Sequence, residues 1–306
     1  MIIDTDPSAD DAVALMLAMA SPELEILGMT AAFGVCDSAR SIKNIMKIQT
    51  LCGREEIPAV QGAEMPLVRR MEFDDAYCGC DGLSQTGLPD PKKKAEPGEA
   101  WRFMAEMVKR FPGEVSIISL APMTNLALMI QNDPAAAADA AAGIYTIAGS
   151  YGLRPDYENL NPRAEWNLAQ DPEAAAVVFG SGIPIMAAGL DVTRRLDNSM
   201  MERLLAAAKE GKKTGFLRRA VQFNINHGLE PYSLLVDSAA VCLALCPEIV
   251  KTVSGHVMVE TKGEHTTGQI LFGNSGRFKK QGSQVQAAWD YDWDRLLDFL
   301  EKRVFS

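Results

Sequence analysis

Short apolar runs alternate with stretches of helical periodicity through the first two-thirds of the chain. Strands are expected at residues 2–3, 25–31, 58–61, 115–120, 145–148 and 184–188. Helices are expected from about residue 10 to 20, around Ile42, Ile45 and Ile48, and over residues 171–179. Strands that alternate with helices are typical of a mostly parallel central sheet with helices on both faces. The pattern therefore predicts an α/β fold, in which ligands bind beyond the carboxyl ends of the strands.

The last third of the chain departs from this alternation. Residues 255–260 and 269–271 predict a small late β-hairpin, and the amphipathic residues 292–304 predict a closing helix. Loops rich in glycine, proline and charge are candidates for the rim of a binding site, and they lie at residues 71–99, 151–163 and 211–231. Because no repeat or linker divides the sequence, residues 1–306 are expected to form one domain.

Composition limits the kind of partner. The net charge of −10 and the isoelectric point near 4.9 argue against nucleic acid or an anionic membrane. No apolar stretch approaches the length of a membrane span, and no signal peptide is visible, so a cytoplasmic protein is expected. The six cysteines are scattered, and the close pair Cys78 and Cys80 lacks the second pair of a zinc site. Free thiols in a reducing compartment are therefore expected.

The most informative segment is the acidic sequence at residues 4–11, which reads Asp-Thr-Asp-Pro-Ser-Ala-Asp-Asp. Ser8 as a helix N-cap, with Asp10 and Asp11 complementing the helix dipole, would explain the last two acids. It does not explain Asp4 and Asp6, which stand at the end of a buried strand where an unpaired carboxylate is costly. Hard oxygen ligands on a tight turn suit Ca²⁺ or Mg²⁺, so the segment indicates a cation site.

Three later segments contain residues that could complete such a site. Residues 119–125 pass from a strand into a helix, so backbone carbonyls there can face the same rim. Asp237 begins an apolar helix, where a lone aspartate is more often a simple N-cap. Residues 158–167 combine amides, an acid and an aromatic residue ahead of a helix, a composition suited to sugar hydroxyls but weak evidence by itself.

Taken together and in this order, these segments resemble the inosine–uridine preferring nucleoside hydrolase family. Residues 4–11 match its Asp-x-Asp-Pro-Gly-x-Asp-Asp signature, with Ser8 in place of the glycine. Residues 122–125 match its Pro-x-Thr-Asn turn, residues 164–167 its Ala-Glu-(aromatic)-Asn motif, and Asp237 its late aspartate. The resemblance extends from about residue 1 to the closing helix, and it implies a Rossmann-like α/β fold.

The resemblance also implies an activity, a metal and a set of site residues. The activity is hydrolysis of the N-glycosidic bond of purine or pyrimidine ribonucleosides, as in nucleoside salvage, by a homodimer or homotetramer. Ca²⁺ would be bound by Asp6, Asp11, Asp237 and the carbonyl of Thr124, and Asp6 would act as general base. The ribose hydroxyls would be bound by Asp10, Asn159, Glu165 and Asn167. The cation would activate water, and the acids and amides would stabilise an oxocarbenium-like transition state.

The leaving-group side of the site departs from the family pattern. Residues that often include histidine or asparagine in the family are Val35, Cys78, Arg194 and Val236 here. Base recognition is therefore expected to differ from that of the inosine- and uridine-type enzymes. Candidates for contacts to the base are Tyr77, Trp166, His227 and Tyr232. A residue of these types in a loop more often packs against the protein or lies at the rim of the site than takes part in catalysis. His256 and His265 fall in the late hairpin and are interpreted as structural.

Two other hypotheses differ in class. Asp4-Thr5-Asp6 is similar to the nucleophile pair of haloacid-dehalogenase-type phosphatases, but these continue with Gly-Thr and give the segment around Glu165 no role. A non-catalytic protein that binds ribosides or Ca²⁺ would explain the lost histidines, while the intact acids favour catalysis. A hydrolase of a non-nucleoside N-riboside is a third alternative.

Overall fold

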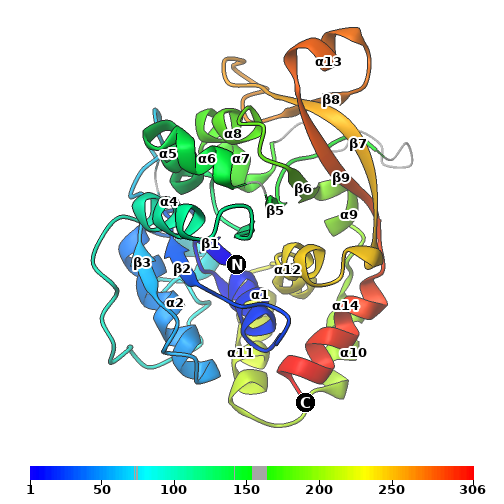
Figure 1. Ribbon diagram of the computed structural model, residues 1–306. Coiled ribbons are helices and arrows are strands. Elements are labelled where there is room, and N and C mark those ends of the chain that lie inside the picture. Colours follow the sequence, from blue (N-terminus) through cyan, green and yellow to red (C-terminus); the bar gives the residue numbers. More distant parts are fainter. Residues whose placement is uncertain (72, 74, 141, 154–163) are drawn as a thin grey trace.

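The computed structural model describes the chain except for residues 72, 74, 141 and 154–163 (Figure 1). The strands are β1 (Ile2–Thr5), β2 (Gly28–Ala31), β3 (Ala59–Gln61), β4 (Ile117–Ser119), β5 (Ile144–Ile147), β6 (Ile185–Ala188), β7 (Val250–Val259), β8 (Ile270–Gly273) and β9 (Ser283–Tyr291). The helices of the first half are α1 (Ala9–Met19), α2 (Ser38–Cys52), α3 (Asp75–Cys78), α4 (Ala100–Arg110), α5 (Thr124–Asn132) and α6 (Pro134–Asp139). Those of the second half are α7 (Trp166–Gln170), α8 (Pro172–Phe179), α9 (Leu190–Thr193), α10 (Asn198–Ala207), α11 (Lys212–Asn226), α12 (Ser238–Leu245), α13 (Gly276–Gln281) and α14 (Trp293–Phe299). Short helical turns lie at Pro231–Leu235, Pro247–Ile249 and Leu300–Val304.

The described strands form one sheet in the order β3-β2-β1-β4-β5-β6-β9-β7-β8. All neighbours from β3 to β9 run parallel, which confirms the α/β prediction, and β7 pairs antiparallel with both β8 and β9. The chain winds outward from β1 to β3 on one side and from β4 to β6 on the other. The carboxyl ends of β1 and β4 therefore flank a topological switch point, which is where open α/β sheets bind ligands.

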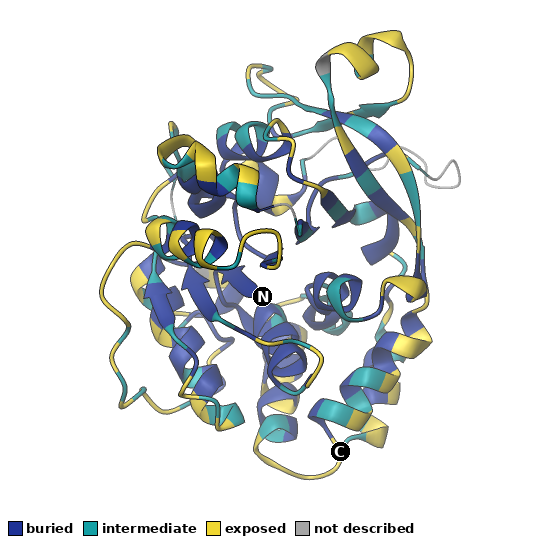
Figure 2. Cartoon of the chain, viewed as in Figure 1, coloured by how far each residue is buried: buried dark blue, intermediate teal, exposed yellow. Residues whose placement is uncertain are grey.

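Both faces of the sheet are covered, as the apolar strands require. Neighbouring strand residues point to opposite faces, and Ile2 and Ile3 accordingly belong to two separate hydrophobic clusters. The cluster around Ile3 contains side chains of α1, α2, α11, α12 and α14, and that around Ile2 contains side chains of α4, α5, α6 and α8. Helix α1 is apolar nearly all round and is buried along its length (Figure 2). The first turn of α1 is therefore held rigidly beneath the switch point.

The late hairpin is confirmed, but it is larger than the sequence indicates. Strand β7 begins at Val250 and pairs with β8 through His256 and Gly273. It also pairs with β9, a strand that sequence analysis does not predict, and β9 joins the hairpin to β6. The extension projects from the rest of the molecule with α13 at its tip (Figure 1). Strand β9 carries Gln284, Gln286 and Asp290 among its apolar residues, and Val285 and Ala287 are buried.

The closing helix is present as α14 and the turn that follows it. Leu296, Leu297 and Leu300 are buried against the cluster around Ile3, as the amphipathic pattern predicts. Among the helices described, none has both the length and the hydrophobicity to cross a bilayer. All six cysteines are free thiols.

Candidate active site

A cavity of about 640 Å³ opens at the carboxyl ends of the central strands. Leu120, Ile147 and Leu190, which follow or end β4, β5 and β6, line its floor. Its acidic lining residues are Asp6, Asp10, Asp11, Glu165, Asp237 and Glu264. The sheet thus brings together motifs that are more than 200 residues apart in the chain.

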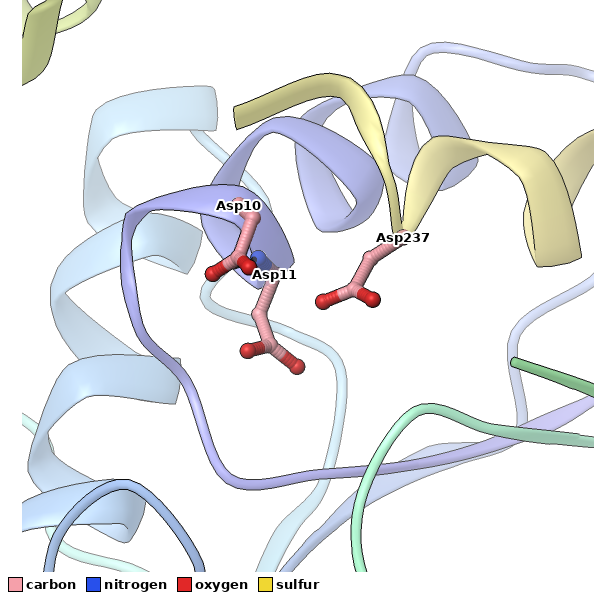
Figure 3. A group of neighbouring side chains, drawn as sticks. All are labelled: Asp10, Asp11 and Asp237. Carbon is pink, nitrogen blue, oxygen red and sulfur yellow. Dashed lines mark hydrogen bonds between the residues drawn. The ribbon is translucent and has the colours of Figure 1, made fainter. Parts of the chain in front are cut away.

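Three aspartates form the most compact acidic group. Asp10 and Asp11 lie in the first turn of α1, and Asp237 immediately precedes α12 (Figure 3). One carboxylate oxygen from each lies within 4.8 Å of the other two. Burial, followed by repulsion from Asp10, raises the pKa of Asp11 to about 7, and burial and repulsion by Asp11 raise the pKa of Asp237 well above its usual value. Such a group of oxygen donors fits a divalent cation, which would relieve the repulsion.

Hydrogen bonds orient the two aspartates of α1. Asp11 accepts hydrogen bonds from the Thr5 hydroxyl at 2.5 Å and from the Ser8 backbone N–H at 3.1 Å. The Ser8 hydroxyl donates to Asp10. Ser8, at the position of the family's glycine, therefore holds one of the acids that line the cavity. Asp11 also satisfies a backbone donor at the start of α1, so the capping interpretation and the cation-site interpretation apply to the same residue.

Asp6 lines the cavity but lies outside the group of three. Its Oδ2 accepts a hydrogen bond from the Val35 backbone N–H at 2.7 Å. Burial and the charge of Asp11 raise its pKa well above the usual value. A Cβ atom at Gly34 would lie 1.8 Å from Asp6 Oδ2. The absence of a side chain at Gly34 therefore makes room for the Asp6 carboxylate.

Asp4 and Thr124 lie outside the residues that line the cavity. Asp4 is fully buried, and its Oδ1 accepts hydrogen bonds from Thr30 and Asn125 at 2.6 and 2.9 Å. Asp4 thus ties β1 to its neighbours, and hydrogen-bond donors stabilise it where sequence analysis invokes a cation. Thr124 begins α5, and its hydroxyl donates to Asp171 at 2.6 Å. The role of the Thr124 carbonyl as a ligand stays a prediction.

Glu165 and Asn167 line the cavity on the side of β5. Glu165 caps α7 by accepting from the backbone N–H of Asn167 at 2.8 Å, and burial raises its pKa to about 7. The Asn167 side-chain nitrogen donates to the Leu120 carbonyl at 2.8 Å. This bond anchors the motif to the end of β4 and orients both polar side chains. Asn159, the remaining predicted ribose residue, lies outside the described residues.

Two of the four predicted base contacts lie at the cavity. Tyr77 and Trp166 stack with ring centroids 6.2 Å apart and an interplanar angle of 18°, and both line the cavity while remaining about half exposed. Tyr232 and His227 are not among the residues that line it. Tyr232 packs against the hydrophobic cluster around Ile3, and His227 stacks on Phe223.

Three of the four residues at which the sequence departs from the family pattern line the cavity, and so does His265. Val35 and Val236 line the cavity with apolar side chains. Cys78 does not line the cavity and is buried beside the Val35 carbonyl. Arg194, at the end of α9, and His265, in the turn between β7 and β8, also line the cavity. The structural interpretation of His265 therefore needs correction. Arg194 stands out in the sequence only as a departure from the family's Asp-Val-Thr-His pattern, and His265 gives no such signal.

The chain is similar to known proteins over nearly its whole length. The family model for inosine-uridine preferring nucleoside hydrolase matches residues 1–298. A pyrimidine-specific ribonucleoside hydrolase of Salmonella agona is 36% identical over 313 residues, covering 99% of this chain and 97% of that protein. A probable uridine nucleosidase of Arabidopsis thaliana is 31% identical, covering 92% of this chain and 88% of that protein.

Solved structures give the same result. A purine-preferring ribonucleoside hydrolase from Gardnerella vaginalis superimposes with a TM-score of 0.86 at 27% identity, covering 99% of this chain and 97% of that chain. The chain therefore belongs to the inosine-uridine preferring nucleoside hydrolase family and is a hydrolase of the N-glycosidic bond of ribonucleosides.

Proposed function

We propose that the chain hydrolyses pyrimidine ribonucleosides to ribose and free base with the help of bound Ca²⁺. The observation that carries this proposal is the group formed by Asp10, Asp11 and Asp237, which shares one cavity with Glu165 and Asn167. Asp11 and Asp237 provide oxygen donors for a cation, and Asp10, Glu165 and Asn167 provide hydrogen-bond acceptors and donors for a sugar. The names of the relatives at 36% and 31% identity favour a pyrimidine base.

Asp6, Asp11, Asp237 and the Thr124 carbonyl would hold the cation. Carboxylates and carbonyls are the ligands that Ca²⁺ prefers, and Ca²⁺ tolerates the irregular geometry of ligands from three separate segments. When bound, the cation would neutralise the buried acids and activate the attacking water. The raised pKa values of Asp11 and Asp237 support this assignment, because they reflect burial and mutual repulsion of the carboxylates, which a bound cation would relieve.

Asp6 would accept the proton of the attacking water. Its Oδ2 already accepts from Val35, so Oδ1 is the oxygen left for the proton. The hydrogen bond and the close approach of Gly34 keep this carboxylate in one position, as a general base requires.

Asp10, Glu165 and Asn167, together with Asn159, would bind the ribose hydroxyls. Positive charge develops on the sugar as the glycosidic bond breaks, and the surrounding carboxylates stabilise it in a site shielded from water. Glu165 and Asn167 are held by backbone hydrogen bonds before substrate binds, so little reorganisation is needed.

The remaining parts of the proposal concern the setting of the enzyme. We place it in the cytoplasm, in salvage of nucleosides, as a homodimer or homotetramer built from single-domain chains, with neither nucleic acid nor membrane as partner. The net charge of −10 and the six free thiols support this setting. A hydrolase of another N-riboside, or a binding protein without turnover, would use the same cavity.

One assay separates these functions. We would measure hydrolysis of p-nitrophenyl β-D-ribofuranoside and of a nucleoside panel, each with Ca²⁺ and with a chelator. Ca²⁺-dependent release of uracil or cytosine is the expected result. Turnover of the nitrophenyl riboside alone would indicate a different natural aglycone. Tight nucleoside binding without turnover of any substrate would favour the binding protein.

A further inference from the structure

Arg194 is a cation beside an acidic cavity. It follows α9 and lines the cavity together with the aspartates. Its guanidinium makes no hydrogen bond or ion pair with any residue that the structure describes. The adjacent Arg195, in contrast, donates to Asp290 at 2.5 Å and does not line the cavity. The Arg194 side chain is therefore available to a ligand.

The sheet order separates Arg194 from the aspartates. Asp6, Asp10 and Asp11 follow β1, Asn167 comes after β5, and Arg194 comes after β6, in the order β1-β4-β5-β6. With adjacent strands about 4.8 Å apart, the ends of β1 and β6 lie roughly 14 Å apart. If a ribose is held between Asp10 and Asn167, the base attached to that ribose would lie within reach of a long side chain at the end of α9.

The reaction needs positive charge near that substituent. The departing base takes the electron pair of the glycosidic bond, and it must receive a proton or be stabilised as an anion. Val236 and Cys78 offer neither, since the first is apolar and the second is buried outside the cavity lining. Within the described lining, Arg194 and His265 are the side chains with a nitrogen that can carry positive charge. Arginine is charged at any physiological pH.

We propose that Arg194 is a catalytic residue that binds the departing base and stabilises its negative charge. This inference rests on the proposed function. The bond between C1′ and the base nitrogen breaks, and its electron pair spreads over the base onto a carbonyl oxygen, to which the guanidinium donates hydrogen bonds. Water adds to the anomeric carbon and gives its proton to Asp6, and the released base takes a proton from solvent. Bases with carbonyl groups beside the glycosidic nitrogen, such as uracil, are therefore the favoured leaving groups.

The test compares two leaving groups in wild type and in Arg194→Met. For uridine, kcat is expected to fall about 100-fold, the effect of removing one preorganised donor from a developing anion. For p-nitrophenyl β-D-ribofuranoside, whose phenolate leaves without assistance, kcat is expected to change less than about 3-fold. Arg194→Lys should recover part of the uridine activity, because it keeps the charge but loses the fork of donors. Arg195→Met, the matched control outside the cavity, should leave the ratio of the two activities unchanged.

Other results would overturn the assignment. An equal loss for both substrates in Arg194→Met would indicate a structural role, and a uridine-selective loss in His265→Ala but not in Arg194→Met would transfer the role to the histidine. If wild type cleaved uridine 5′-monophosphate better than uridine, and Arg194→Met abolished that preference, the guanidinium would bind a phosphate instead. If wild type cleaved neither riboside with Ca²⁺ present, the proposed function itself would fail.

Discussion

Replacing Gly34 by alanine tests whether the position of Asp6 limits catalysis. The new Cβ atom would lie 1.8 Å from Asp6 Oδ2, whereas real contacts of this kind are not found below 3.0 Å, so the carboxylate must move by about 1.2 Å. A misplacement of about 1 Å at a reacting group costs on the order of 100-fold in rate. The barrier should therefore rise by about 2.7 kcal/mol.

The assay is kcat for p-nitrophenyl β-D-ribofuranoside at saturating Ca²⁺, because this substrate is independent of the leaving-group residues. The matched control is Gly276→Ala at the start of α13, where an added Cβ meets nothing within 4 Å and activity should stay at the wild-type level. In an Asp6→Asn background, Gly34→Ala should add little further loss, since both changes affect the same group. A Gly34→Ala enzyme within about 3-fold of wild type would refute the reasoning.

Three further predictions concern the metal, the rim and the sheet extension. Asp11→Ala should abolish activity and weaken Ca²⁺ binding at least 100-fold in calorimetry, while the circular dichroism spectrum stays native; a fully active variant would contradict the site. Trp166→Ala should raise KM for nucleosides several-fold with kcat nearly unchanged, because its half-exposed ring lines the cavity and is free to stack on a base, and an unchanged KM would remove it from base binding. Lys251 and Arg195 lower the pKa of Asp290 to about 2, so its stabilising effect is full above pH 3.8 and disappears as the pH falls towards 2. Asp290→Asn should accordingly lower stability by about 1 kcal/mol at pH 7 and by about half as much at pH 3 in thermal unfolding, a difference that a merely steric effect would not produce.

Several features of the site are local, and the sequence alone predicts them. Asp10 and Asp11 follow a strand by a few residues, and Glu165 and Asn167 lie within three residues at a helix start. Short segments of this kind place their side chains through strand ends and helix caps, which depend on neighbouring residues. The α/β class is predictable for a similar reason, since strands covered on both faces must be apolar throughout.

Sequence analysis goes wrong where a segment depends on its neighbours in space. Strand β9 has buried residues at Val285 and Ala287, and its place in the sheet depends on β6 and β7, which provide its hydrogen-bond partners. Asp4 has the same residue type as the cavity aspartates, yet its Oδ1 accepts hydrogen bonds from Thr30 and Asn125 inside the sheet, and it does not line the cavity. Tyr232 and His227 stand in a plausible loop but are not among the residues that line the cavity, so their contact with a base stays a prediction.

By itself, then, the sequence determined the acidic and amide motifs, the alternation of strands and helices, and through them the chemistry at the sugar. Only the tertiary structure decided which distant residues share the cavity. Arg194 and His265 reach it because β6 and the β7–β8 turn lie where the order of the sheet puts them. That order results from long-range pairing and packing, which no short stretch of sequence encodes. The side chains that meet the departing base are therefore a property of the assembled sheet.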